Sequence, residues 1–144
     1  MYKKILMAFD GTIEGRSALM ECAEIASFVH AQTHLLAVAN MPSTMFLTEG
    51  FVPEELIETE KKRMQGVLDD GIVILKDRGF VSIPHLVVGE PVEEIGRAAK
   101  DLACDLIVVG HKRESRWAAR WWKGSVSASL VDRVSCSLLI VITK

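Results

Sequence analysis

Residues 4–10 read Lys-Ile-Leu-Met-Ala-Phe-Asp, a short apolar run that ends at a carboxylate. Apolar side chains occupy both faces of this run, which is typical of a strand buried inside a parallel sheet. The next stretch repeats apolar side chains at helical spacing and begins at Thr12, a residue type that favours helix N-caps. We therefore predict a strand over 4–9 and a helix over 12–30.

The same alternation continues to the end of the chain. Further strands are expected over 33–39, 83–88, 105–109 and 137–142, and further helices over 53–78, after the turn at 89–91, and from Gly124-Ser125. Repeated strand–helix units predict one α/β domain over residues 1–144, built as a doubly wound parallel sheet of five strands with helices on both faces.

Composition narrows the class of protein. The chain has 144 residues, 49% hydrophobic and 25% charged, as in ordinary globular domains. Its net charge of -2 argues against nucleic-acid binding over the whole surface. No segment approaches the roughly 20 apolar residues of a membrane span, and the first apolar run is too short for a signal peptide. We therefore expect a cytoplasmic protein that binds neither nucleic acid nor membrane.

Residues that often carry chemistry show no catalytic or metal-binding pattern. The three cysteines (Cys22, Cys104 and Cys136) form no CxxC pair and lie in apolar contexts, so we interpret them as buried, reduced thiols. The four histidines lack metal-ligand spacing, and we place His111 in a loop near the expected site. No GxSxG, HExxH or complete P-loop occurs, so no catalytic residue and no protein-held metal are predicted.

Topology alone indicates where a ligand would bind. In doubly wound sheets, ligands lie beyond the carboxyl ends of the strands, where the strand order reverses. The segments expected there are 10–12, 38–40, 89–90 and 110–111. Gly110 would let a ligand approach the backbone, and Gly124-Ser125 would offer helix N–H groups to an anion. The alternative is a glycine turn and a serine N-cap without a ligand.

Several motifs, taken in order, resemble the universal stress protein family across essentially the whole chain. They are the opening Lys-Ile-Leu-Met-Ala-Phe-Asp-Gly-Thr (4–12), Gly-Glu-Pro-Val-Glu-Glu-Ile (89–95), Asp-Leu-Ile-Val-Val-Gly (105–110), Gly-Ser-Val (124–126) and the closing run 136–141. The resemblance implies the strand order 3-2-1-4-5 and a homodimer formed through the last strand. It also implies binding of ATP or AMP, with Mg²⁺ present only together with the nucleotide.

The resemblance also implies the binding residues. Asp10 should lie near the nucleotide, Val38 and Val109 beside the base, and Gly110 and Gly124-Ser125-Val126 near the phosphates. Arg113 stands where the family motif has its second glycine, and ten residues rather than nine separate it from Gly124. An arginine there either blocks the approach or reaches the phosphates with its own guanidinium. Asp10 has a second interpretation, as a carboxylate that closes the turn before the first helix.

Two further segments have simple structural interpretations. Trp117 and Trp121, four residues apart, favour packing of a short helix onto the body or onto a protein partner over binding of nucleic acid or membrane. The charged run over 54–63 is interpreted as a solvated helix face with ion pairs.

Three functions follow from these residues. The first is a dimeric regulatory module that binds an adenine nucleotide and acts on an unidentified protein partner. The second, motivated by Arg113, is an interaction protein without nucleotide. The third is a slow ATPase, for which the sequence supplies no assigned base.

Overall fold

The computed structural model describes residues 1–41, 53–112 and 126–143, and its centre is one five-stranded sheet. Neighbouring strands all run parallel, in the order β3-β2-β1-β4-β5. The strands are β1 (Lys4–Ala8), β2 (Gln32–Asn40), β3 (Ile83–Gly89), β4 (Leu106–Lys112) and β5 (Ser137–Thr143). The predicted fold class and the implied strand order are confirmed.

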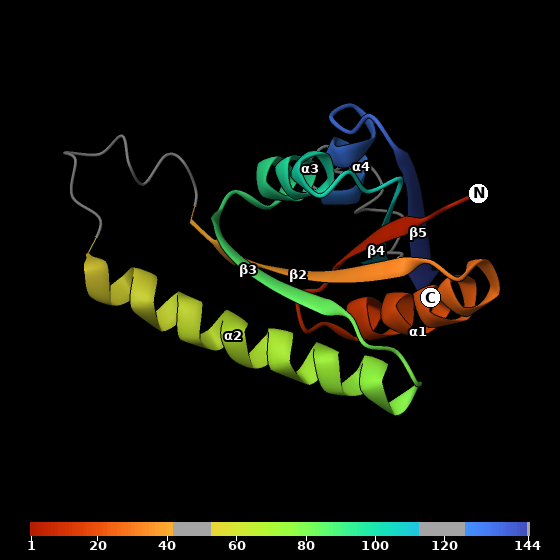
Figure 1. Ribbon diagram of the computed structural model, residues 1–144. Coiled ribbons are helices and arrows are strands. Elements are labelled where there is room, and N and C mark those ends of the chain that lie inside the picture. The colour runs from red at the N-terminus through yellow and green to blue at the C-terminus, as the bar shows by residue number, and fades with distance from the viewer. Residues whose placement is uncertain (42–52, 113–125, 144) are drawn as a thin grey trace.

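Helices cover both faces of this sheet (Figure 1). Helices α1 (Ile13–Val29) and α2 (Glu54–Asp77) pack on one face, and α3 (Pro91–Asp101) and α4 (Val126–Val131) pack on the other. The first two crossovers build the sheet outward from β1 to β3, and α3 then returns the chain to β4 on the other side of β1. The strand order therefore reverses between β1 and β4. No helix in the described part of the chain is long and apolar enough to cross a membrane.

The central strand β1 is enclosed from both faces. Ile5, Leu6 and Met7 are almost completely buried. Ile5 and Met7 belong to the core beneath α1 and α2, whereas Leu6 belongs to the core beneath α3. Burial of each such side chain contributes about 1.5–3 kcal/mol, which explains why the run is apolar at consecutive positions.

Two glycines inside α2 have different roles. A Cβ at Gly71 would lie 2.7 Å from Leu35 Cδ2 and 2.8 Å from Phe9 Cδ2, whereas a Cβ at Gly66 would meet nothing within 4 Å. Gly71 therefore allows α2 to lie close to β2 and to the end of β1. This close approach brings the N-terminal half of α2 toward the carboxyl ends of the strands (Figure 1).

Strand β4 is longer than the sequence predicts. The expected strand ends at residue 109, but β4 continues to Lys112, and Gly110 and His111 pair with Val141 and Ile142 of β5. The interpretation of His111 as a loop residue is therefore wrong. The parallel pairing with β5 keeps these residues in the sheet, although glycine by itself disfavours strands.

The three cysteines are free thiols in different environments. Cys22 and Cys104 are buried, as expected, but Cys136 is half-buried, which corrects the expectation for that residue. Burial raises the pKa of the Cys22 thiol to about 12 and contributes most to raising that of Cys104 to about 11. Both thiols are therefore neutral at physiological pH and poor nucleophiles.

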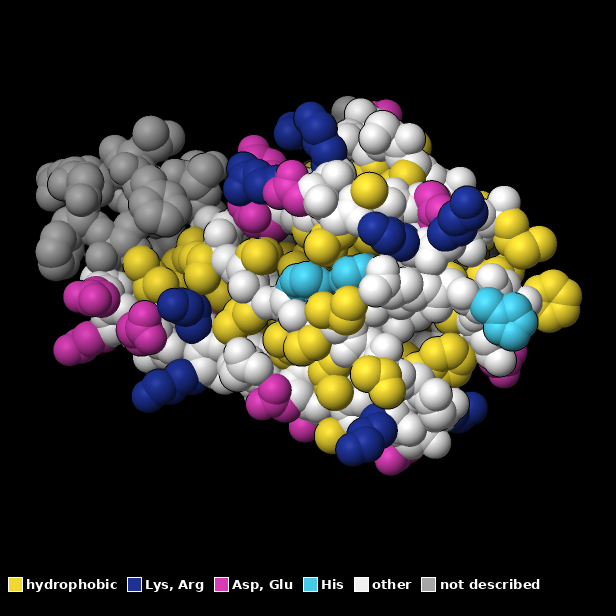
Figure 2. Space-filling view, viewed as in Figure 1, with side chains coloured by type: hydrophobic (Ala, Val, Ile, Leu, Met, Phe, Trp, Pro, Cys, Tyr) yellow, Lys and Arg dark blue, Asp and Glu magenta, His cyan; other side chains and the backbone are white. Residues whose placement is uncertain are grey.

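Two histidines form a pair on the face of the sheet that carries α3. His34 Nδ1 of β2 lies 2.9 Å from His85 Nε2 of β3, so one ring donates a hydrogen bond and the other accepts it. Histidine side chains lie side by side on this face, surrounded by hydrophobic side chains (Figure 2). Burial lowers the pKa of both imidazoles. For His34, the positive charges of His85 and Lys4 lower the pKa further. The folded protein therefore favours the neutral rings.

We expect the folded protein to lose stability as the pH falls below about 6.5, the ordinary histidine pKa. The unfolded chain then binds protons that the folded histidine pair resists, so the contribution is complete above that pH and is lost below it. Urea unfolding at pH 7.5 and pH 5.5 measures the difference. The His34→Gln/His85→Gln double variant should show a smaller loss, whereas His30→Asn, at an exposed helix end, should behave like the wild type. An equal loss in all three proteins would contradict the assignment.

Candidate functional site

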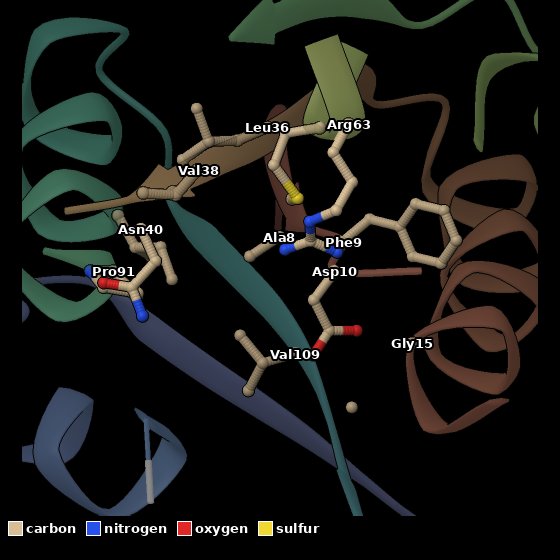
Figure 3. A pocket seen from close by; sticks show the side chains of 13 residues that line it. Ala8, Phe9, Asp10, Gly15, Leu36, Val38, Asn40, Arg63, Pro91 and Val109 are labelled. Atoms are coloured by element: carbon tan, nitrogen blue, oxygen red, sulfur yellow. The ribbon is translucent and has the colours of Figure 1, made fainter. Parts of the chain in front are cut away.

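A cavity of about 290 Å³ opens where the strand order reverses (Figure 3). Its walls come from the carboxyl ends of β1, β2 and β4, the first turn of α1, the N-terminal half of α2 and the start of α3. Its volume lies close to the lower end of the range for small-molecule sites, roughly 300–1,000 Å³. The cavity therefore occupies the position at which doubly wound sheets bind ligands.

The structure brings together four of the residues selected from the sequence. Asp10, Val38, Val109 and Gly110 all line this cavity, although they are spread over a hundred positions of the chain. Val126 is the first residue of α4. The other three, Arg113, Gly124 and Ser125, lie outside the described residues, as do Trp117 and Trp121.

Asp10 fixes the turn between β1 and α1. Its Oδ1 accepts hydrogen bonds from the backbone N–H of Thr12 (3.0 Å) and from the Thr12 hydroxyl (2.5 Å). Thr12 Oγ1 in turn accepts a hydrogen bond from the Gly15 N–H (3.0 Å) and caps the helix. The predicted N-cap and the turn-closing interpretation of Asp10 are both present. Both of these bonds go to Oδ1, and Oδ2 accepts no hydrogen bond from the described residues.

Gly110 allows α1 to contact β4 directly. A Cβ at Gly110 would overlap the Glu14 carbonyl group and would lie 2.8 Å from the Gly15 nitrogen. The position where a side chain would stand is therefore filled by the backbone of the first turn of α1. Gly110 still lines the cavity, so its missing side chain serves the packing of the helix as well as the shape of the site.

The cavity has an apolar part and a polar part (Figure 3). Val38, Pro91 and Val109 lie on one side of it together with the amide of Asn40. Asp10 and Arg63 lie on another side, where their charges interact. The apolar part suits a flat organic ring, and the polar part suits hydroxyl or charged groups. Among the described residues, no group of three or more His, Cys, Asp or Glu side chains is placed to hold a metal ion.

Arg63 is a charged cavity residue that the sequence does not mark as part of a site. It had been grouped with the solvated charges of α2, and it does form an ion pair there: its Nη2 lies 2.7 Å from Glu60 Oε1. Lys61 and Glu58 form a second pair, at 3.6 Å. Arg63 also lines the cavity, however, and points toward Asp10 (Figure 3). No local pattern marks it, because its position depends on how closely α2 approaches the sheet.

A second cavity, of about 270 Å³, lies at the amino ends of β4 and β5. Cys104, Cys136, Lys100 and Arg133 are among its lining residues. It is thus separated from the first cavity by the length of the strands. None of the candidate binding residues named from the sequence lines it.

Comparison with known proteins assigns the family. The sequence profile of the Universal stress protein family matches residues 1–141. The chain belongs to the universal stress protein family. Universal stress protein YxiE of Bacillus subtilis (strain 168) is 27% identical over 149 residues, which cover 98% of this chain and 99% of YxiE. A crystal structure of a universal stress protein family member from Burkholderia pseudomallei is 27% identical, has a TM-score of 0.74, and matches over 97% of this chain and 96% of that one.

Two solved structures with the universal stress protein fold contain an adenine nucleotide. A universal stress protein in complex with cAMP is 24% identical, with a TM-score of 0.76 and coverage of 99% of both chains. A family protein from Arabidopsis thaliana with AMP bound is 18% identical, with a TM-score of 0.70 and coverage of 99% of this chain and 92% of that one. At these identities the likeness is one of fold.

We expect Gly110→Ala to destabilise the protein by about 1–3 kcal/mol, because the new methyl group meets backbone atoms that cannot rotate away. Gly96→Ala is the matched control, since its Cβ would meet nothing within 4 Å on helix α3. That change should stabilise the protein by up to about 1 kcal/mol through helix propensity. Urea unfolding measures both. A Gly110→Ala variant as stable as the wild type would contradict the described contact between α1 and β4.

Proposed function

We propose that this universal stress protein family member is a regulatory module that binds an adenine nucleotide, ATP or AMP, at the carboxyl ends of β1 and β4. The observation that carries the proposal is the cavity at the reversal of strand order, with valines on one side and Asp10 and Arg63 on another. The relatives of the same fold with cAMP or AMP bound support an adenine nucleotide as the ligand.

In this proposal, different residues contact the base, the ribose and the phosphates. The base lies between Val38 and Val109, whose side chains supply apolar contact. Asp10 Oδ2 accepts a hydrogen bond from a ribose hydroxyl, while Oδ1 keeps the turn closed. The phosphates extend past Gly110 toward Val126 at the start of α4 and toward Arg113, Gly124 and Ser125, which the family resemblance assigns to phosphate binding. Mg²⁺ accompanies the phosphates and has no site of its own.

The proposed module is a cytoplasmic homodimer formed through β5. This strand is an edge of the sheet, and an edge strand offers unpaired backbone groups to a second copy. Val131 and Ile142 are 60% and 56% exposed, which places apolar surface near the same edge. Nucleotide binding would then change the surface that the dimer offers to an unidentified protein partner. Sedimentation velocity measures the assembly state.

Isothermal titration of the purified protein with AMP and with ATP, each with and without Mg²⁺, should give saturable binding. Val38→Phe should weaken AMP binding by about tenfold or more, because the larger ring fills the apolar part of the cavity and the resulting overlap costs about 1–3 kcal/mol. Val81→Phe is the matched control, because Val81 is 91% exposed and does not line the cavity. This variant should bind AMP with the affinity of the wild type.

Two results would count against the proposal. A flat titration of folded wild-type protein with both nucleotides would favour an interaction protein without nucleotide. Saturable binding that Val38→Phe leaves unchanged would place the nucleotide elsewhere on the chain.

A further inference from the structure

Arg63 supplies a positive charge to the cavity from an element that the family motifs do not include. Of the described residues that line the cavity, Arg63 is the one that carries a Lys or Arg side chain, and Asp10 carries the opposing carboxylate. Arg63 belongs to the N-terminal half of α2, far in sequence from both β1 and β4. Its guanidinium nevertheless points toward Phe9 and Asp10 (Figure 3).

Glu60 orients this guanidinium. Arg63 Nε donates a hydrogen bond to Glu60 Oε2 (3.0 Å), and Nη2 donates one to Oε1 (2.7 Å), so the two planar groups form a two-bond pair. Glu60 is the more enclosed partner, with its side chain 22% exposed against 60% for Arg63. The hydrogen bond from Arg63 and, to a smaller extent, the backbone N–H of Asn40 lower the pKa of Glu60.

The pair with Glu60 leaves part of the guanidinium available. A guanidinium has five N–H donors, and the two hydrogen bonds to Glu60 use two of them. The remaining donors lie on a group that Glu60 already orients. Binding a ligand would therefore cost little further conformational entropy of this side chain. Phosphate oxygens match this planar, charged donor set.

A positive charge beside Asp10 favours a phosphorylated ligand in this cavity. Asp10 sits at the polar side, and its carboxylate repels a phosphate that lies next to the ribose. A cation beside Asp10 offsets that repulsion, whereas a neutral nucleoside gains little from it. The consequence is selectivity for the phosphate and not for the base.

We propose, resting on the nucleotide binding proposed above, that Arg63 is a specificity residue which contacts the phosphate next to the ribose and makes this site prefer AMP over adenosine. The relevant quantity is the ratio of the two dissociation constants. Base contacts are common to AMP and adenosine and cancel in that ratio. The charge of the phosphate does not cancel.

Titration of wild-type protein and Arg63→Gln with AMP and with adenosine, at one fixed salt concentration, tests the proposal. The preference for AMP should fall by roughly tenfold in Arg63→Gln, the factor that corresponds to one lost charged hydrogen bond. Lys62→Gln is the matched control, because it removes the same charge from the neighbouring, exposed position of α2; it should keep the wild-type ratio. Arg63→Lys, which keeps the charge but loses the planar donor set, should give an intermediate ratio. Gln is nearly as good a helix former as Arg, so circular dichroism should show that both Gln variants are folded.

The outcomes separate this inference from the proposed function. If Arg63→Gln weakens AMP and adenosine equally, Arg63 contacts the base or ribose and the inference is overturned. If Arg63→Gln changes neither affinity, Arg63 does not contact the ligand and the inference is overturned. If Lys62→Gln changes the ratio as much as Arg63→Gln does, the effect comes from the overall charge of the protein, and the inference is again overturned. If the folded wild-type protein binds ATP but neither AMP nor adenosine, the inference alone is overturned; if it binds none of the three, the proposed function fails and the inference fails with it.

Discussion

The contact between the first turn of α1 and the backbone of β4 sets the geometry on which the rest of the site depends. At Gly110, the Glu14 carbonyl group occupies the space that any side chain would need. The same turn is closed from the other end by Asp10 and capped by Thr12. Because α1 begins so close to the sheet, it covers the carboxyl ends of β1 and β4 on one side only. No crossover between the strands covers their other side, which stays open. The cavity is the space that this arrangement leaves.

The cavity's remaining walls follow from packing constraints on α2 and on the sheet. Gly71 allows α2 to lie against Phe9 and Leu35, and this approach places Met64 in the core and the neighbouring Arg63 at the rim of the cavity. At the opposite end of the sheet, the Asp105 carboxylate accepts hydrogen bonds from the backbone N–H groups of Lys3 (2.9 Å) and Lys4 (3.1 Å). β1 and β4 are therefore joined at their amino ends, and the space between their continuations is shaped by α1 and α2.

Sequence patterns were sufficient for the architecture because they reflect burial. The apolar run through Ile5, Leu6 and Met7 identifies a strand covered on both faces, and Thr12 identifies the start of a helix. The topology predicted from these patterns placed Asp10, Val38 and Gly110 at the carboxyl ends of the strands, and the family resemblance added Val109; all four line a common cavity. Parallel topology makes this possible, because strand ends that are distant in sequence meet at a single edge.

Features that depend on three-dimensional approach were not predictable. Arg63 looked like any charged residue on an exposed helix face, and only the path of α2 brings it to the cavity. The continuation of β4 through His111 depends on pairing with β5, and the pairing of His34 with His85 depends on the register of β2 and β3. Gly71 and Gly66 are equivalent by helix propensity, yet only Gly71 is required by close packing.

The most direct test of the account is an AMP titration followed by backbone amide chemical shifts in a ¹H–¹⁵N NMR spectrum. The account predicts that, among the described residues, the largest changes fall at the ends of β1, β2 and β4, at Phe9, Asp10, Asn40 and Gly110, with smaller changes near Arg63. Changes concentrated instead around Cys104 and Cys136, in the cavity at the amino ends of β4 and β5, would contradict it.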